Sequence, residues 1–180
     1  MSRGGKGANA WVLGEGRRRG RVTLLNPAPM RDEARDLVAL ADYLTPNETE
    51  RLSGVVVRGA ESAAAAARAL RSRGAGTVIV TLGAQGALAC TADGLVRAPA
   101  LPLAVVDTTA AGDAFNAGLA VALGEARALP DALRFASATA ALACTRRGAQ
   151  PSLPRRDQVE TLLGARGAAE ARLNRRRAAP

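Results

Sequence analysis

The chain has 180 residues, of which 48% are hydrophobic, 23% are charged and only 2% are aromatic, and its formal net charge is +9. This length and apolar content suffice for one core of ordinary size, built from Ala, Val and Leu. No run approaches the roughly 18 consecutive apolar residues of a membrane span, and no charged-then-apolar leader opens the chain. We therefore expect a soluble, cytoplasmic protein that makes no membrane contact.

The basic excess is carried by arginine, since Lys6 is the only lysine. Arginine clusters at residues 17–19, 146–147, 155–156 and 175–177 are dispersed along the chain. The aromatic residues that would stack on bases are nearly absent, which disfavours nucleic-acid binding. The positive charge would still help to attract a polyanionic nucleotide.

Apolar runs and chain-breaking residues predict strands that alternate with helices. The predicted strands lie in residues 21–29, in residues 42–50 up to Pro46, on both sides of a glycine turn in residues 76–90, and near residues 93–96. The predicted helices cover about residues 31–41, 61–73, 112–123, 131–145 and 154–163. This alternation is typical of a layered α/β domain with a mainly parallel sheet.

The composition divides the chain into three predicted parts. Residues 1–20 combine a glycine-rich segment with a stretch, "WVLGEGRRRGR", that looks like a junction. Residues 21–164 form the predicted α/β domain. Residues 165–180 are rich in Arg and Ala, and we expect a frayed or disordered tail there.

The stretch "VVDTTAAGDAFNAGLAVAL", residues 105–123, carries the clearest chemical pattern. Its small residues Ala110, Ala111 and Gly112 precede a helix, whose first N–H groups can bind an anion such as phosphate. Asp113 would repel phosphate, so one interpretation is a base that takes a proton from an attacking hydroxyl. The other interpretation is an acid that only stabilises the helix N-terminus. The local pattern leaves both open.

Several segments together resemble one family, the ribokinase group of the ribokinase/PfkB sugar kinases. The segment "DTTAAGDAFNAGL" is similar to that family's C-terminal motif, and its double alanine is typical of ribokinase-like members. The segments "GGKGAN", "NPAP", "TPNETE", "TLGAQG" and "RRGAQPS" match further family segments in the family's order. The resemblance runs from about Arg21 to Leu163, and it implies a three-layer α/β/α, ribokinase-like (Rossmann-like) fold.

The resemblance also implies an activity and residue roles. The γ-phosphate of ATP would pass to the 5-hydroxyl of D-ribose, giving D-ribose 5-phosphate, with Asp113 as general base. The backbone of Ala110, Ala111 and Gly112 would form the anion hole. ATP would contact the following residues, with Ser137 near the adenine: Asn47, Thr81, Leu82, Gly83, Ala84, Gln85, Gly86, Ala111, Gly112 and Ser137.

The resemblance implies two metal ions. Glu50 would place Mg²⁺ indirectly, through water. Potassium, a monovalent activator, would lie beside the anion hole. Its oxygen ligands would be the side chains of Asp107 and Ser152 and the backbone carbonyls of Thr109, Ala143, Arg146 and Gly148.

On the sugar side the chain departs from the family pattern. Gly5, Lys6, Gly7, Ala8 and Asn9 match the sugar-binding segment, to which Asp113 also contributes. The family's sugar-binding aspartate, the strands of its lid and most of its N-terminal half have no counterpart, so we expect a truncated ribokinase. Two alternatives stay open: a catalytically silent nucleotide-binding remnant, and a related kinase for another sugar or a nucleoside. Full-length relatives are expected to be homodimers, which leaves the oligomeric state of this chain undetermined.

Overall fold

The computed structural model describes residues 4–28, 32–48 and 54–177. The chain divides into two compact units, residues 1–99 and residues 100–180, and each is described by itself. Within the described residues, no helix is both long enough and apolar enough to cross a bilayer.

The first unit contains a five-stranded sheet with the order β1-β2-β3-β4-β5. Its strands are β1 (Leu24–Leu25), β2 (Tyr43–Leu44), β3 (Thr77–Thr81), β4 (Ala87–Cys90) and β5 (Leu95–Ala98). Strands β1, β2 and β3 are parallel, whereas β4 pairs antiparallel with both β3 and β5. The sheet is therefore mixed rather than mainly parallel. The reason is the tight turn between β3 and β4, because so short a connection can only join antiparallel strands.

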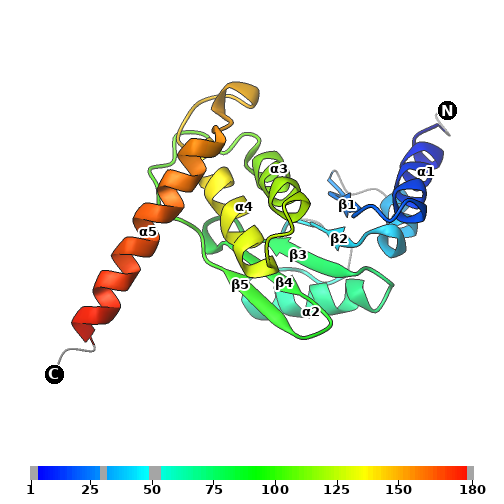
Figure 1. Ribbon diagram of the computed structural model, residues 1–180. Helices are drawn as coiled ribbons and strands as arrows, with labels where there is room; N and C mark the ends of the chain where they lie inside the picture. The colour runs from blue at the N-terminus through cyan, green and yellow to red at the C-terminus, as the bar shows by residue number, and fades with distance from the viewer. Residues whose placement is uncertain (1–3, 29–31, 49–53, 178–180) are drawn as a thin grey trace. The chain divides into compact units, whose positions relative to one another are not determined.

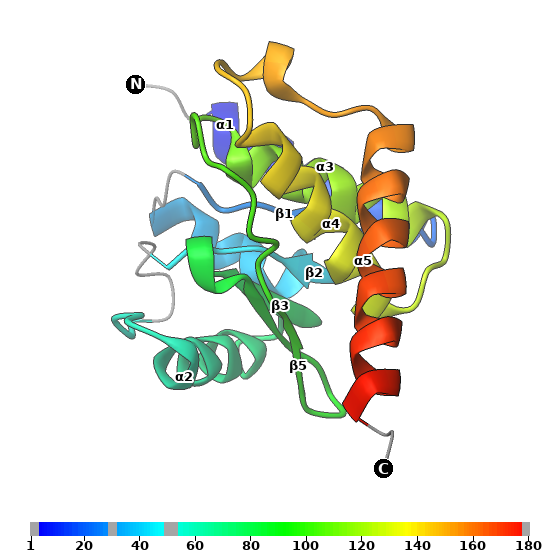
Figure 2. The same cartoon turned by 90° about the vertical axis from the view of Figure 1, so that its left-hand side faces the viewer.

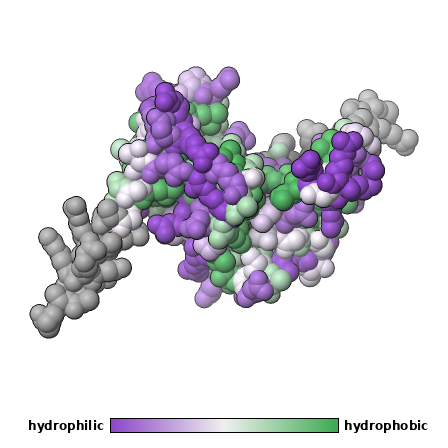
Figure 3. Space-filling model, in the orientation of Figure 1, coloured by the Kyte–Doolittle hydropathy of each residue, from purple (hydrophilic) through white to green (hydrophobic). Residues whose placement is uncertain are grey.

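Two helices, α1 (Gly4–Arg18) and α2 (Ala60–Arg71), and two 3₁₀-helices, η1 (Asp32–Leu40) and η2 (Gly83–Gln85), complete the first unit (Figure 1). The predicted helix at residues 31–41 is thus of the 3₁₀ type. The predicted junction lies largely within α1, so residues 4–18 are helical. Hydrophilic residues predominate around α1 on the face shown in Figure 3, and Trp11 and Val12 of this helix are also exposed.

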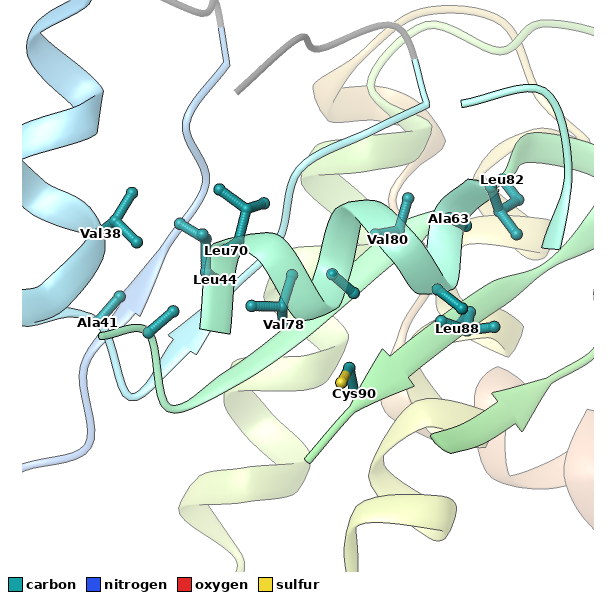
Figure 4. Packing of buried hydrophobic residues seen from close by; sticks show 13 residues of the cluster. Val38, Ala41, Leu44, Ala63, Leu70, Val78, Val80, Leu82, Leu88 and Cys90 are labelled. Atoms are coloured by element: carbon teal, nitrogen blue, oxygen red, sulfur yellow. The ribbon is translucent and has the colours of Figure 1, made fainter. Parts of the chain in front are cut away.

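The core of the first unit lies between α2 and the sheet (Figure 4). Helix α2 packs against β3 and β4, and its inward side consists of small alanines and Leu70. Val78 and Val80 of β3 and Leu88 of β4 are at most 1% exposed beneath it. Small alanines let the helix approach the β-branched strand residues closely, which fits a chain with few aromatics.

The second unit is helical. It contains α3 (Ala111–Gly124), α4 (Leu129–Ala143), the 3₁₀-helix η3 (Gln150–Ser152) and α5 (Arg156–Arg177). Helix α4 packs against both α3 and α5 (Figure 2). Helix α5 continues through residues 165–177, part of the segment for which a frayed or disordered tail was expected. The Ala, Arg, Glu and Leu residues of this segment favour a helix.

Candidate active site

The candidate site is built around the N-terminus of α3. Ala110 precedes the helix in a left-handed conformation, with φ 60° and ψ 14°. Alanine rarely adopts this conformation, and it turns the chain sharply from Thr109 into the helix. The hydrogen bond from the N–H of Ala111 to the carbonyl of Thr108 (3.1 Å) closes this turn.

The helix N-terminus offers free backbone donors. In the described part of the chain, the N–H groups of Gly112 and Asp113 donate no hydrogen bond. The N–H of Ala111, by contrast, is engaged by Thr108. Gly112 is exposed, and no atom lies within 4 Å of the position that a Cβ would take there. Unpaired N–H groups at the positive end of a helix of this length attract an anion.

The side chain of Asp113 is exposed in the first turn of α3. One turn further along, the Asn116 side-chain amide donates to the carbonyl of Gly112 at 2.9 Å. A carboxylate and free N–H groups therefore lie at the same helix end. That combination can bind an anion and accept a proton from a hydroxyl that attacks it.

Asp107 joins two loops of the second unit. Its Oδ1 accepts hydrogen bonds from the N–H (2.9 Å) and hydroxyl (2.6 Å) of Thr109, and its Oδ2 accepts one from the N–H of Gly148 (2.9 Å). The hydroxyl of Thr109, the N–H groups of Gly148 and Thr109 and the charge of Arg147 lower the pKa of Asp107 to about 2. The carboxylate is therefore ionised at neutral pH. Burial of the Cys144 thiol, and then the charge of nearby Asp107, raise the pKa of that thiol, which stays protonated.

The predicted potassium ligands lie in these same two loops. Asp107 and Thr109 precede α3, while Ala143, Arg146, Gly148 and Ser152 end α4 and follow it. Ser152 is 1% exposed and its hydroxyl donates to the carbonyl of Ala149 (2.7 Å), so its lone pairs remain available. A carboxylate has about four acceptor positions, of which three are occupied on Asp107. An oxygen donor set with one free carboxylate position fits a hard monovalent cation.

Ser137 lies within α4 and is 6% exposed, and its Oγ has no hydrogen-bond partner in the described part of the chain. A buried hydroxyl without a partner costs about 1–3 kcal/mol. A ligand that donates to or accepts from this hydroxyl would remove that cost.

The other predicted nucleotide-binding residues lie in the first unit. Asn47 forms a parallel bridge with Thr81, and the N–H of Glu48 donates to the carbonyl of Thr81 at 3.1 Å. The segment from Thr81 to Gly86 forms a tight turn closed by a hydrogen bond from the N–H of Leu82 to the carbonyl of Gly86 (2.7 Å). Asn47 and this turn are therefore adjacent, at the end of β3.

The remaining predicted residues are placed as follows. Gly5, Lys6, Gly7, Ala8 and Asn9 lie in the first turns of α1. Glu50 lies outside the described residues.

Sequence reasoning missed the hydrogen bonds of Asp107 to Thr109 and Gly148. The spacing Asp107-x-Thr109 could have indicated the first of them, because aspartate commonly accepts from the N–H and hydroxyl two residues later. No local pattern indicates the second, because 41 residues separate the two partners.

The chain is similar to known proteins over most of its length. The pattern of the pfkB family carbohydrate kinases matches residues 17–156. A ribokinase from Haemophilus influenzae is 40% identical over 149 residues, which are 82% of this chain and 49% of that protein. A deoxyribokinase from Salmonella typhi is 37% identical over 151 residues, with the same two coverages. The chain thus spans about half the length of the curated relatives that it matches.

Solved structures share the fold. The ribokinase of Arabidopsis thaliana, in complex with ribose and ATP, is 34% identical with a TM-score of 0.83, over 88% of this chain and 52% of that one. A fructokinase variant from Vibrio cholerae, in its fructose-, ADP- and potassium-bound form, is 26% identical with a TM-score of 0.73, over 84% of this chain and 53% of that one. The fold is thus ribokinase-like α/β, and the chain belongs to the pfkB family of carbohydrate kinases.

Proposed function

We propose that this chain acts in an ATP-dependent sugar kinase that transfers the γ-phosphate of ATP to the 5-hydroxyl of D-ribose. The observation that carries the proposal is the N-terminus of α3, where the exposed Asp113 accompanies the free N–H groups of Gly112 and Asp113. The 40% identity to a ribokinase supports ribose as the sugar.

In this mechanism Asp113 accepts the proton of the sugar hydroxyl while the hydroxyl oxygen forms a bond to the γ-phosphorus. The bond between the γ-phosphorus and the bridging oxygen breaks, and ADP leaves with that electron pair. The N–H groups at the start of α3 stabilise the negative charge on the transferring group. Binding of the adenine end of ATP near Ser137 would satisfy its unpartnered hydroxyl.

The proposal assigns two ions to the site. Mg²⁺ would arrive with ATP and neutralise charge on its phosphates, and Glu50 would orient it through water. Potassium would bind the Asp107 and Ser152 side chains with the carbonyls of Thr109, Ala143, Arg146 and Gly148. The potassium-bound Vibrio fructokinase supports this assignment.

A variant pair tests the role of Asp113. Asp113 and Asp131 are both exposed acids at the third position of a helix, in α3 and α4 respectively. We expect Asp113→Asn to reduce kcat about 100- to 10,000-fold with little change in ATP affinity, because the amide cannot take the proton. Asp131→Asn, which changes the same helix position, should leave kcat unchanged. Comparable activity in the two variants would reduce Asp113 to a helix-stabilising residue.

The activity itself is tested by ribose-dependent ADP release from the 180-residue chain, together with a fluorescence titration of ATP binding. ATP binding without ribose-dependent release would favour the silent nucleotide-binding alternative. The deoxyribokinase relative makes 2-deoxyribose the second sugar to test. A kcat/KM for 2-deoxyribose above that for ribose would overturn the assignment of ribose.

A further inference from the structure

Asp107 lies where two backbone segments of the second unit meet, the one before α3 and the one after α4. Its carboxylate is bonded to Thr109, just before α3, and to Gly148, in the loop after α4. In addition, the N–H groups of Val106 and Asp107 both donate to the carbonyl of Cys144, at 2.8 Å and 3.2 Å. The chain before α3 is therefore joined to the C-terminal end of α4 by backbone and side-chain hydrogen bonds together.

Each partner of Asp107 is itself fixed. Gly148 has φ +90°, a conformation that L side chains rarely adopt, so its N–H is oriented by a backbone that suits glycine. Thr109 directly precedes Ala110, the left-handed residue that turns the chain into α3. The hydrogen bonds of Asp107 to Thr109 thus act one residue away from the turn that orients the free N–H groups of Gly112 and Asp113.

Donors from the protein itself fill most of the acceptor positions of the Asp107 carboxylate. Three of about four acceptor positions on Asp107 receive donors from Thr109 and Gly148. A cation could bind only the acceptor position of Asp107 that remains free. These hydrogen bonds close the loops around Asp107 with donors that the protein itself supplies.

We propose that Asp107 and Thr109 form a cation-independent clamp that positions the N-terminal turn of α3. Asp107 and Thr109 are positioning residues. Only the expected effect of the clamp on catalysis rests on the proposed function. Potassium then adds to an arrangement that exists without it. The turn that presents the N–H groups of Gly112 and Asp113 is ordered in potassium-free buffer.

The test uses the full chain and three variants, Thr109→Val, Thr109→Ser and Asp107→Asn. Thr109→Val removes the hydroxyl donor and keeps the N–H, whereas Thr109→Ser keeps both. The matched control is Thr161→Val, because the Thr161 hydroxyl also makes one exposed hydrogen bond, to the carbonyl of Asp157 at 2.7 Å, but lies in α5. Thermal unfolding and amide exchange of a peptide covering residues 107–116 are measured in tetramethylammonium buffer, with and without potassium.

Without potassium, we expect Thr109→Val and Asp107→Asn to lower Tm by about 2–4 °C and to speed exchange in residues 107–116 several-fold, in line with the loss of about one hydrogen bond. Thr109→Ser should restore both values, and Thr161→Val should change neither. Added potassium should raise the Tm of Thr109→Val as much as that of the parent, because the cation ligands remain. If turnover is measurable, Thr109→Val should lower kcat with little effect on the KM for ribose.

The clamp is overturned if, without potassium, Thr109→Val has the same Tm and the same exchange in residues 107–116 as the parent, and Asp107→Asn differs from the parent in these values only when potassium is present. It is equally overturned if Thr161→Val speeds exchange in residues 107–116 as much as Thr109→Val does. The unfolding and exchange measurements need no turnover, so they decide the clamp even if the chain shows no kinase activity. Conversely, the parent chain could show ribose-dependent turnover while Thr109→Val keeps the parent's Tm and exchange rate. That result would overturn the clamp and leave the proposed function standing.

Discussion

At the residue scale, the decisive feature is the left-handed backbone of Ala110. Among the described residues, Ala110 and Ala126 are the two non-glycine residues with positive φ, 60° and 56°. Such a conformation costs an L residue roughly 1–2 kcal/mol. At Ala110 the surrounding turn imposes it, and the geometry of the candidate anion hole depends on it.

Substitution of Ala110 tests this dependence. We expect Ala110→Gly to keep turnover and Tm close to those of the parent, because glycine adopts φ 60° without steric cost. Ala110→Val should be destabilised by about 1–3 kcal/mol, because a β-branched side chain is strained there, and should raise the KM for ATP. Urea unfolding and steady-state kinetics provide both measurements.

Ala126→Val is the matched control for Ala110→Val. It places the same strain in the turn between α3 and α4, so it should lose similar stability without a change in the KM for ATP. An equal rise in that KM in both valine variants would show that general destabilisation, rather than the anion hole, is responsible.

At the element scale, the contact between α3 and α4 depends on Gly118. A Cβ at Gly118 would lie 2.6 Å from Oγ1 and 2.9 Å from Cβ of Thr139, and 3.1 Å from Cα of Ala136. Thr139 is 8% exposed and its hydroxyl is bonded to the carbonyl of Phe135, so it has little freedom to move aside. The two helices therefore approach as closely as glycine allows.

We expect Gly118→Ala to lower the free energy of unfolding despite the better helix propensity of alanine. Overpacking costs typically about 1–3 kcal/mol, whereas Ala gains at most about 1 kcal/mol over Gly in a helix. Gly124→Ala is the control, because it lies in the same helix with no atom within 4 Å of the added Cβ and should be neutral or stabilising. Denaturant unfolding gives the free energy of unfolding of both variants. A Gly118→Ala variant more stable than the parent would contradict the close packing.

The start of α5 is held by an ion-pair network at the turn between α3 and α4. Glu125 pairs with Arg156 and with Arg127, and Arg127 also contacts Glu160 at 2.6 Å. Hydrogen bonds from Arg156, then from Arg127, lower the pKa of Glu125 below its ordinary value of 4.5. Hydrophilic residues cover the first turns of α5 on the face shown in Figure 3.

This network gives stability a pH dependence with a definite sign. Because the folded-state pKa of Glu125 is lowered, its contribution is present above pH 4.5 and is lost as the pH falls through the folded-state value. The free energy of unfolding of Glu125→Gln should therefore fall less steeply than that of the parent as the pH decreases from about 6 to 3. Parallel pH profiles would show that Glu125 is not coupled to its arginines.

At the scale of the whole molecule, charge should govern nucleotide binding. A net charge of +9 attracts ATP, and added salt screens that attraction over about 10 Å at 0.1 M. We expect the Kd for ATP to rise as tetramethylammonium chloride increases, while the KM for uncharged ribose changes little. An ATP affinity that is insensitive to this salt would mean that only local contacts attract the nucleotide.

The sequence predicts the elements of this chain better than it predicts their ends and contacts. Ala content predicts α2, and β-branched runs predict β3, because these signals are local. Helix α1 was not predicted, because its glycines disfavour a helix. In the structure it packs against η1. The small-residue turn before Asp113 was predicted from its composition. The left-handed backbone of Ala110 was not, because alanine rarely adopts it. The bond from Gly148 to Asp107 was not either, because 41 residues separate the partners.

The mixed pairing of the sheet also bears on the order in which the chain folds. Strands β3, β4 and β5 are joined by short turns, such as the one closed by the N–H of Thr91 and the carbonyl of Gly94 at 2.8 Å. Strands β1, β2 and β3 pair only after the segments containing η1 and α2 have been brought together, at a greater cost in loop entropy. We therefore expect the β3–β4–β5 meander to form first, and the parallel edge at β1 to be the last part of the sheet to form and the first to open.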